Sequence, residues 1–147
     1  MAAHQLSASA LIQAAPQDIY AIIADYHDGH TRIVPKPPFV SVDVEQGGVG
    51  AGTVIKVVIR LLGKNQTYRA TVTEPEPGRV LVETNENGYV TSFTVEPREG
   101  GKQAYVTIAT DMSGKGFLER WLMTRLLRPV YVKELEQLAT VAGARTA

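Results

Sequence analysis

The chain has 147 residues, no cysteine and a formal net charge of zero, because fifteen lysines and arginines balance fifteen acidic residues. The lack of cysteine excludes disulfide scaffolds, cysteine-ligated zinc or iron–sulfur sites and thiol nucleophiles. The balanced charge argues against a dedicated nucleic-acid binder, which usually carries a basic excess. Apolar runs are far shorter than the ~20 residues that span a bilayer, and residues 1–5 lack the features of a signal peptide. We therefore expect one cytoplasmic domain over residues 1–147, without integral membrane association.

The first part of the chain predicts a strand followed by two helices. Residues 6–13 alternate apolar with small polar side chains, which is typical of a strand. Pro16 suits the first turn of a helix, and apolar residues then recur at helical spacing as far as Tyr26. Gly29 interrupts this helix, and a second short helix is predicted over residues 31–34, before Pro35.

From Phe39 to Asp111 the apolar period is two, which predicts six strands separated by turns rich in glycine, proline and asparagine. We expect these strands at residues 39–46, 53–62, 67–73, 79–84, 89–96 and 103–111. The second has the clearest alternation, with one aliphatic face and one face that carries Lys56 and Arg60. The short spacing of the strands predicts an antiparallel meander.

After residues 113–116 the period returns to 3.6 and predicts one long helix over residues 117–142, kinked or loosened at Pro129. A run of strands followed by a helix predicts an α+β fold, in which the helix crosses one face of a curved sheet of six or seven antiparallel strands. One helix covers only part of such a sheet. We therefore expect an internal cavity between the sheet and the helix.

Several short segments occur along the chain in a characteristic order. They are AAPQDIY at 14–20, DY at 25–26, RIVP at 32–35, GAGT at 50–53, VTEPEPGR at 72–79 and the last helix with its proline. In this order they resemble the SRPBCC/START-like helix-grip superfamily, which includes START lipid-transfer domains, birch-pollen-type allergens and polyketide cyclase/dehydrase-like proteins. The resemblance covers nearly the whole chain. It implies the helix-grip fold and a role in binding, transporting or converting an apolar small molecule.

Six strand residues are candidates for the ligand-contacting wall of the cavity. Ile55, Val57 and Ile59 form the aliphatic face of the clearest strand, and Tyr68, Tyr89 and Phe93 lie on neighbouring strands. A tyrosine hydroxyl in the cavity can hydrogen-bond a ligand carbonyl or act as a general acid. Alternatively, each tyrosine lies at the rim of the sheet with its hydroxyl in water.

Four residues of the last helix complete this candidate ligand site: Phe117, Trp121, Leu122 and Arg125. At roughly 100° per residue, Trp121 and Leu122 fall in one apolar arc, with Arg125 in its middle. An arginine aimed into the cavity could anchor a carboxylate, phosphate or enolate. Alternatively, Arg125 extends to solvent past its aliphatic stem, or pairs with a sheet acid. The three candidate acids are Glu83, Glu96 and Asp111. Phe117 and Trp121 are equally compatible with a pocket wall and with ordinary core.

The sequence predicts no metal site and no cofactor. His27 and His30 flank an aspartate, but Gly29 breaks the helix between them and no third histidine follows nearby, so a solvated turn is the favoured interpretation. The glycine-rich residues 47–52 are not followed by a helix. They therefore predict a flexible connection between strands and not a phosphate-binding loop.

Two functions from different classes remain open, and no assembled nucleophile–base pair or other catalytic motif decides between them. The favoured hypothesis is a module that binds or carries a lipid, polyketide, isoprenoid or quinone in the cavity. The alternative is a cyclase/dehydratase-type enzyme, a lyase or isomerase, in which Arg125 stabilises an enolate and a tyrosine transfers a proton. A third hypothesis, an interaction protein like ribosome-associated relatives of this fold, is disfavoured by the lack of basic excess. The oligomeric state is not predicted.

Overall fold

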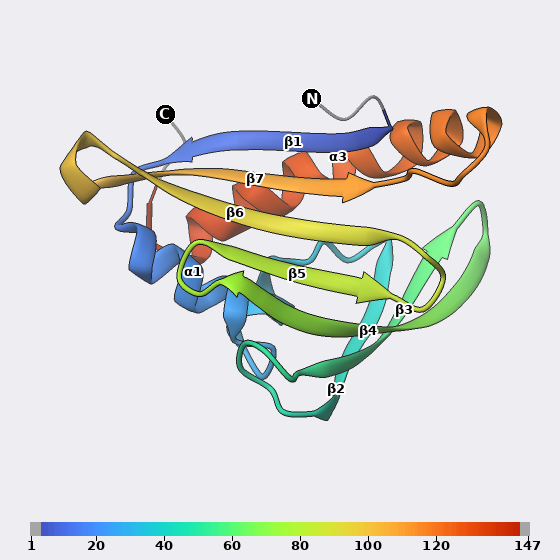
Figure 1. Ribbon diagram of the computed structural model, residues 1–147, viewed down its shortest axis with the longest axis horizontal. Coiled ribbons are helices and arrows are strands. Elements are labelled where there is room, and N and C mark those ends of the chain that lie inside the picture. Colours follow the sequence, from blue (N-terminus) through green and yellow to red (C-terminus); the bar gives the residue numbers. More distant parts are fainter. Residues whose placement is uncertain (1–3, 145–147) are drawn as a thin grey trace.

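The computed structural model describes residues 4–144, and Figure 1 shows their strands side by side in one curved sheet, with the long last helix passing behind it. In chain order the elements are β1 (Gln5–Ile12), α1 (Pro16–Ala24), α2 (Gly29–Ile33), β2 (Phe39–Gln46), β3 (Val54–Leu61), β4 (Lys64–Glu76), β5 (Val80–Asn85), β6 (Val90–Arg98), the 3₁₀ turn η1 (Glu99–Gly101), β7 (Gln103–Asp111) and α3 (Phe117–Val141). Residues 1–3, part of the segment used to predict the absence of a signal peptide, lie outside the described residues.

All seven strands pair antiparallel, in the order β1-β7-β6-β5-β4-β3-β2. Strands β2 to β7 form consecutive hairpins, and β1 joins the sheet beside β7. The edge strands are therefore β1 and β2, although only α1 and α2 separate them in the chain. These two helices cross from one edge of the sheet to the other. The predicted helix-grip arrangement, a curved antiparallel sheet with a long C-terminal helix, is confirmed.

The alternation predicted for β3 is confirmed by burial. Ile55, Val57 and Ile59 are at most 4% exposed, whereas the side chain of Arg60 lies on the other, solvent-facing side. Most strand bounds agree with the sequence analysis to within two residues. Strand β4 is longer than predicted, because Lys64–Gln66 and Glu74–Glu76 extend it at both ends, where proline and polar residues had indicated turns.

Helix α3 runs without interruption from Phe117 to Val141, with Pro129 inside it. Burial is uneven along the helix, since its buried residues begin at Leu127. The C-terminal half packs against β1 and α2, and the side-chain amide of Gln137 donates a hydrogen bond of 2.9 Å to the carbonyl oxygen of Ile33. The second half of α3 is therefore the part that is firmly attached to the rest of the fold.

Among the described residues, no helix combines the length and the apolar character needed to cross a membrane.

Candidate functional site

A cavity of about 410 Å³ lies between the inner face of the sheet and α3. All seven strands contribute to its lining, together with α2 and one side of α3. Most of the lining surface is apolar, and its polar groups come from side chains on β4, β5, β6, β7, α2, α3 and the turns beside β6 and α3. This volume lies within the range of about 300–1,000 Å³ that is usual for small-molecule sites.

The six strand residues predicted for the ligand wall all line this cavity. Ile55, Val57 and Ile59 form a continuous aliphatic strip on β3. The aromatic rings of Tyr68, Tyr89 and Phe93 come from β4, the turn before β6 and β6 itself. Tyr105, on β7, is not among the lining residues, and its ring is covered by the guanidinium of Arg98 at 5.0 Å.

The four helix residues do not line the cavity, and the apolar arc predicted for α3 is wrong as its inner face. Phe117 and Trp121 are 71% and 54% exposed, and Leu122 is half-buried away from the cavity. Arg125 is exposed, and its guanidinium lies 5.5 Å from the centre of the Trp121 ring. Within residues 4–144, no sheet acid forms an ion pair with Arg125, so neither the anchoring role nor the predicted pairing is found.

The inner face of α3 lies on the opposite side of the helix. Met123, Leu127, Tyr131 and Glu134 recur at intervals of three and four residues and face the cavity. Apolar side chains occur on several sides of α3, so periodicity alone does not select one face. All four predicted residues precede Leu127, in the part of the helix where no residue is fully buried. The aromatic residues at the start of α3 therefore do not belong to the core.

His30 is the buried centre of a polar cluster at the cavity wall. A Cβ on Gly29 would lie 2.6 Å from the Ile22 carbonyl oxygen, so only glycine lets α2 begin this close to α1. His30 is consequently 3% exposed, and its Nδ1 lies 2.7 Å from the Ile23 carbonyl oxygen. Its ring stacks on Tyr26, with 4.2 Å between ring centres. The prediction of a solvated turn is correct for the exposed His27 but wrong for His30.

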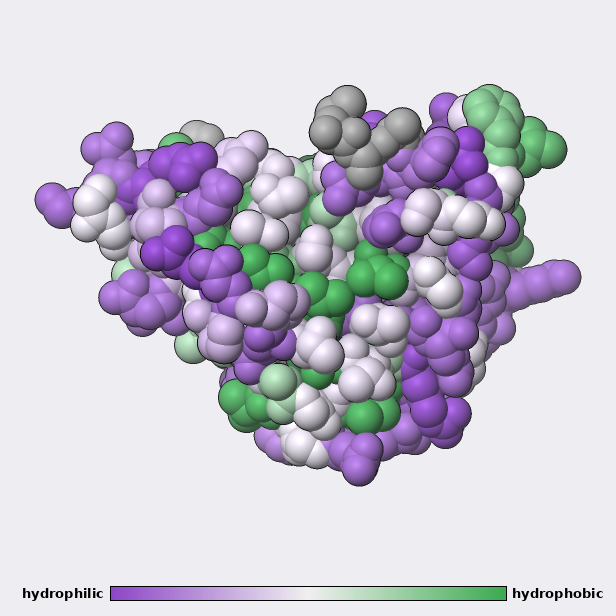
Figure 2. Space-filling view, in the orientation of Figure 1, coloured by the Kyte–Doolittle hydropathy of each residue, from purple (hydrophilic) through white to green (hydrophobic). Residues whose placement is uncertain are grey.

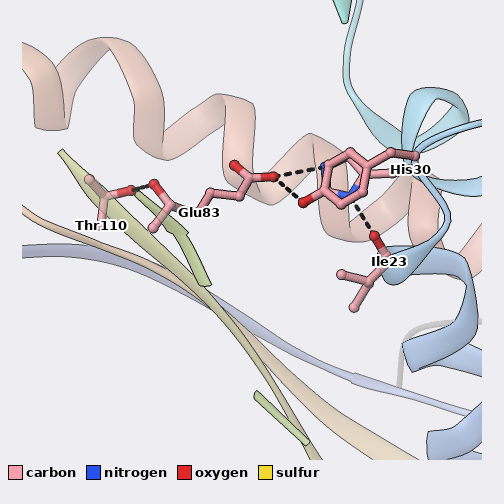
Figure 3. Close-up of polar contacts among 6 residues, drawn as sticks. Ile23, His30, Glu83 and Thr110 are labelled. Atoms are coloured by element: carbon pink, nitrogen blue, oxygen red, sulfur yellow. Dashed lines mark hydrogen bonds and ion pairs between the residues drawn. The ribbon is translucent and has the colours of Figure 1, made fainter. Parts of the chain in front are cut away.

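Glu83 of β5 joins His30 and Tyr26 into one proton-sharing group. The Tyr26 hydroxyl donates a hydrogen bond to Glu83 Oε2, and His30 Nε2 lies 3.5 Å from the same oxygen. Figure 3 shows the His30 ring between the Ile23 carbonyl and the Glu83 carboxyl group. Because a carbonyl oxygen only accepts, the Nδ1–H of His30 donates to the Ile23 carbonyl, and Nε2 is the ring nitrogen that faces the Glu83 carboxyl group. Burial, and then the charge of Glu83, raises the pKa of Tyr26, which keeps this hydroxyl protonated.

A second polar group lines the cavity from α3 and β7. The Tyr131 hydroxyl lies 2.5 Å from Thr110 Oγ1, which in turn lies 2.8 Å from Thr91 Oγ1. Burial raises the pKa of Tyr131 to about 12. One turn along the helix, Glu134 is 3% exposed, and burial followed by the negative charge of Glu83 raises its pKa well above the usual 4.5. The wall therefore presents neutral hydroxyls beside a carboxyl group that favours its protonated form.

Sequence reasoning missed His30, Glu83 and Glu134 as cavity residues. For Glu83 a signal was available, because it shares the inner face of β5 with Leu81 two residues earlier. Glu134 gave no such signal, since an acid in a helix is ordinarily assigned to the solvent side. The burial of His30 could not be predicted, because it depends on the close contact between Gly29 and the Ile22 backbone. Within residues 4–144, no three histidine, aspartate or glutamate side chains lie close enough together to hold a metal ion.

The cavity reaches solvent beside the start of α3, since Gln66, Asn87 and Glu119 line it and are exposed. Lys115 crosses this opening: its Nζ donates a 2.8 Å hydrogen bond to the Asn87 carbonyl and lies 4.7 Å from the centre of the Tyr89 ring. The Tyr89 hydroxyl donates to the carboxylate of Glu119. Figure 2 shows an apolar group at the corner where Figure 1 places the first turns of α3, which carry the exposed Phe117 and Leu118.

Comparisons with known proteins agree with this architecture. The family model described as polyketide cyclase / dehydrase and lipid transport matches residues 3–143. The solution structure of the KanY protein is 26% identical, with a TM-score of 0.83 over 97% of this chain and 99% of that chain. An aromatase/cyclase, Zhui, from a Streptomyces species is 14% identical, with a TM-score of 0.75 over 95% and 93% of the two chains. The protein TTHA0849 from Thermus thermophilus is 18% identical, with a TM-score of 0.70 over 94% and 96%.

At 14% and 18% identity, the last two similarities show the fold alone. The search of curated proteins found no match.

Proposed function

Because the chain belongs to the polyketide cyclase / dehydrase and lipid transport family, we propose that it binds an apolar small molecule in the cavity between the sheet and α3. The observation that carries this proposal is the cavity itself. Buried aliphatic and aromatic side chains of the inner face surround a space of about 410 Å³ and do not close it. Protein interiors are ordinarily packed to crystal density, so a space of this size indicates a place for a ligand.

The lining favours a ligand that is mostly apolar with one polar end. The β3 strip and Leu127 supply aliphatic contact, and burial of apolar ligand surface is worth roughly 25 cal/mol per Å². The polar groups of the wall gather around His30, Glu83 and Glu134. A polar group of the ligand would be oriented toward this cluster, and its apolar part would extend along β3.

Native mass spectrometry of protein purified without detergent, followed by thermal-shift measurements with a panel of lipids, quinones and polyketides, tests the proposal. We expect either a copurified apolar molecule or stabilisation that grows with ligand concentration, by about 2.7 kcal/mol at one hundred times Kd. Ile59→Phe, which fills the cavity, should abolish this stabilisation. The matched Val58→Phe, on the opposite face of the same strand, should retain it. Protein that stays empty and is not stabilised by any member of the panel would overturn the proposal.

The His30–Glu83 contact favours a second candidate function, a cyclase-type enzyme acting on a molecule bound in the same cavity. His30 and Glu83 are both side chains that serve as general acids or bases, and the pair is within reach of a ligand because both residues line the cavity. The pair would remove the proton from a carbon between two carbonyl groups. The resulting enolate would form a carbon–carbon bond with another carbonyl of the same molecule, and the proton would return to the oxygen produced. Arg125 has no part in this step, because it lies outside the cavity.

Turnover of a poly-β-ketone by wild-type protein and by His30→Asn separates the enzyme from the binder. An enzyme that uses this pair should lose at least about a hundredfold in turnover, which is typical for removal of a general acid–base group. His27→Asn, at an exposed position three residues earlier, is the control and should react like wild type. If the wild-type protein binds the compound without converting it, the catalytic candidate is discarded and the binding function remains.

A further inference from the structure

Glu134 faces the cavity from α3 without a partner for its carboxyl group. It is 3% exposed and belongs to the cavity lining. Among the hydrogen bonds and ion pairs of residues 4–144, none includes the Glu134 side chain. A buried carboxyl group without hydrogen bonds or counter-charge is unfavourable, and such groups are ordinarily paired. The unpaired carboxyl group therefore indicates that a bound molecule supplies the missing partner.

The other charged residues of the lining already have partners. Glu83 contacts His30 and accepts a hydrogen bond from Tyr26. At the opening, Glu119 accepts from the Tyr89 hydroxyl and Lys115 donates to a backbone carbonyl. Within the described part of the lining, Glu134 is the acid whose side chain has neither an ion pair nor a hydrogen bond. The inner part of the cavity thus holds one carboxyl group that is free to pair with a bound molecule.

The aromatic part of the lining also suits a cation. Tyr68 and Tyr131 approach the cavity from β4 and α3, and Tyr131 lies one helical turn before Glu134. Burial raises the pKa of both tyrosines, which keeps their rings neutral and their hydroxyls protonated. The faces of such rings attract ammonium groups. A carboxylate ligand would instead bring a second negative charge close to Glu83.

We propose that the molecule bound in the cavity is an amine, in which an apolar body fills the space along β3 and a protonated nitrogen pairs with Glu134. This inference rests on the proposed binding function and specifies its ligand class. The ammonium group supplies the counter-charge and the hydrogen-bond donor that Glu134 lacks, and it pairs with the ionised carboxylate. A ketone accepts a hydrogen bond only from the protonated carboxyl group and supplies no counter-charge. The missing counter-charge at Glu134 therefore favours the amine.

Titration calorimetry at neutral pH with four naphthalene probes of matched size tests this ligand class. The probes are 2-(2-naphthyl)ethylamine, the corresponding alcohol, 2-naphthylacetic acid and methyl 2-naphthyl ketone. We expect the amine to bind about tenfold or more tightly than the alcohol and the ketone, a difference of about 1.4 kcal/mol, and the acid to bind most weakly. Binding of the alcohol or ketone as tight as that of the amine overturns the amine assignment and leaves the binding function intact. If none of the four probes binds, that result counts against both the amine assignment and the binding function.

Glu134→Gln assigns the effect to the carboxyl group. The substitution keeps the size of the side chain and removes its charge, so the amine should lose about tenfold in affinity while the alcohol changes little. Glu136→Gln, an exposed acid two residues along the same helix, is the matched control and should leave both affinities unchanged. An amine preference that survives in Glu134→Gln would show that the proposed pairing is wrong.

Discussion

At the scale of single residues, Glu134 couples the stability of the fold to pH. Its carboxyl group is buried in the cavity wall, and burial, followed by the charge of Glu83, raises its pKa well above 4.5. The folded state therefore keeps the proton at pH values where the unfolded state has released it. The stability associated with this proton is fully present below about pH 4.5 and is lost as the pH rises toward the pKa of the folded state.

We expect Glu134→Gln to be more stable than wild type at neutral pH, by a margin that grows with pH. The glutamine carries no proton to lose, so the difference should increase by up to about 1.4 kcal/mol per pH unit between about pH 5 and the pKa of the folded state. Urea unfolding at several pH values measures it. For Glu136→Gln, whose carboxyl group is exposed, the difference in unfolding free energy from wild type should stay constant over this pH range. A difference in unfolding free energy between Glu134→Gln and wild type that does not change with pH would mean that this carboxyl group is already ionised in the folded protein.

At the scale of elements, the strands were predictable and the orientation of α3 was not. A strand has two faces, so the alternation in β3 assigns Ile55 and Val57 to the inner side as soon as one face is polar. A helix can be rotated through any angle, and the apolar side chains of α3 are distributed around it. Trp121 belongs to the segment before the buried half of α3, and Glu134 belongs to the buried half. Hydrophobicity therefore pointed to the wrong side of the helix.

Two features depend on contacts that a sequence pattern does not encode. They are the burial of His30 and the fixed position of the loop between β2 and β3. The loop, predicted to be flexible, accepts a 2.8 Å hydrogen bond from the Tyr26 amide at the Gly48 carbonyl, and the Gly50 amide donates to the Ala24 carbonyl. Residues 24 and 26 belong to the end of α1 and the turn after it. The position of Tyr26, and through it that of His30, thus results from contacts between segments that lie more than twenty residues apart.

The corrected face of α3 gives a direct prediction for binding. Met123→Trp places a larger side chain in the cavity lining and should weaken binding of an apolar probe by about tenfold or more, because overpacking leaves less room for it. Trp121→Ala and Arg125→Ala remove side chains that lie outside the cavity and should leave the affinity unchanged. Probe titration of the three variants measures this. If Arg125→Ala lost binding while Met123→Trp bound normally, the face of α3 predicted from the sequence would be the one that contacts the ligand.

At the scale of the whole molecule, the curved sheet is kept open by elements at its edges. Helices α1 and α2 connect the edge strands β1 and β2, and α3 packs against β1 and α2. Helix α3 packs on the edge strand β1 and α1 packs on β6 and β7, while the inner faces of β3 to β6 also line the cavity. Close packing favours a closed core, so the open space must be held by this arrangement of helices and sheet.

Such a space makes the response to pressure a property of the entire fold. Unfolding eliminates internal voids, and the volume change of unfolding, about −20 to −100 mL/mol for proteins in general, scales with them. With a cavity of about 410 Å³, wild-type protein should show a larger volume decrease than Ile59→Phe, which fills part of that space. Val58→Phe, on the outer face of β3, should behave like wild type. High-pressure fluorescence or NMR gives the unfolding volumes, and a bound ligand should reduce the decrease as Ile59→Phe does. Equal volumes for Ile59→Phe and wild type would mean that water already fills the cavity, and that a ligand enters by displacing it.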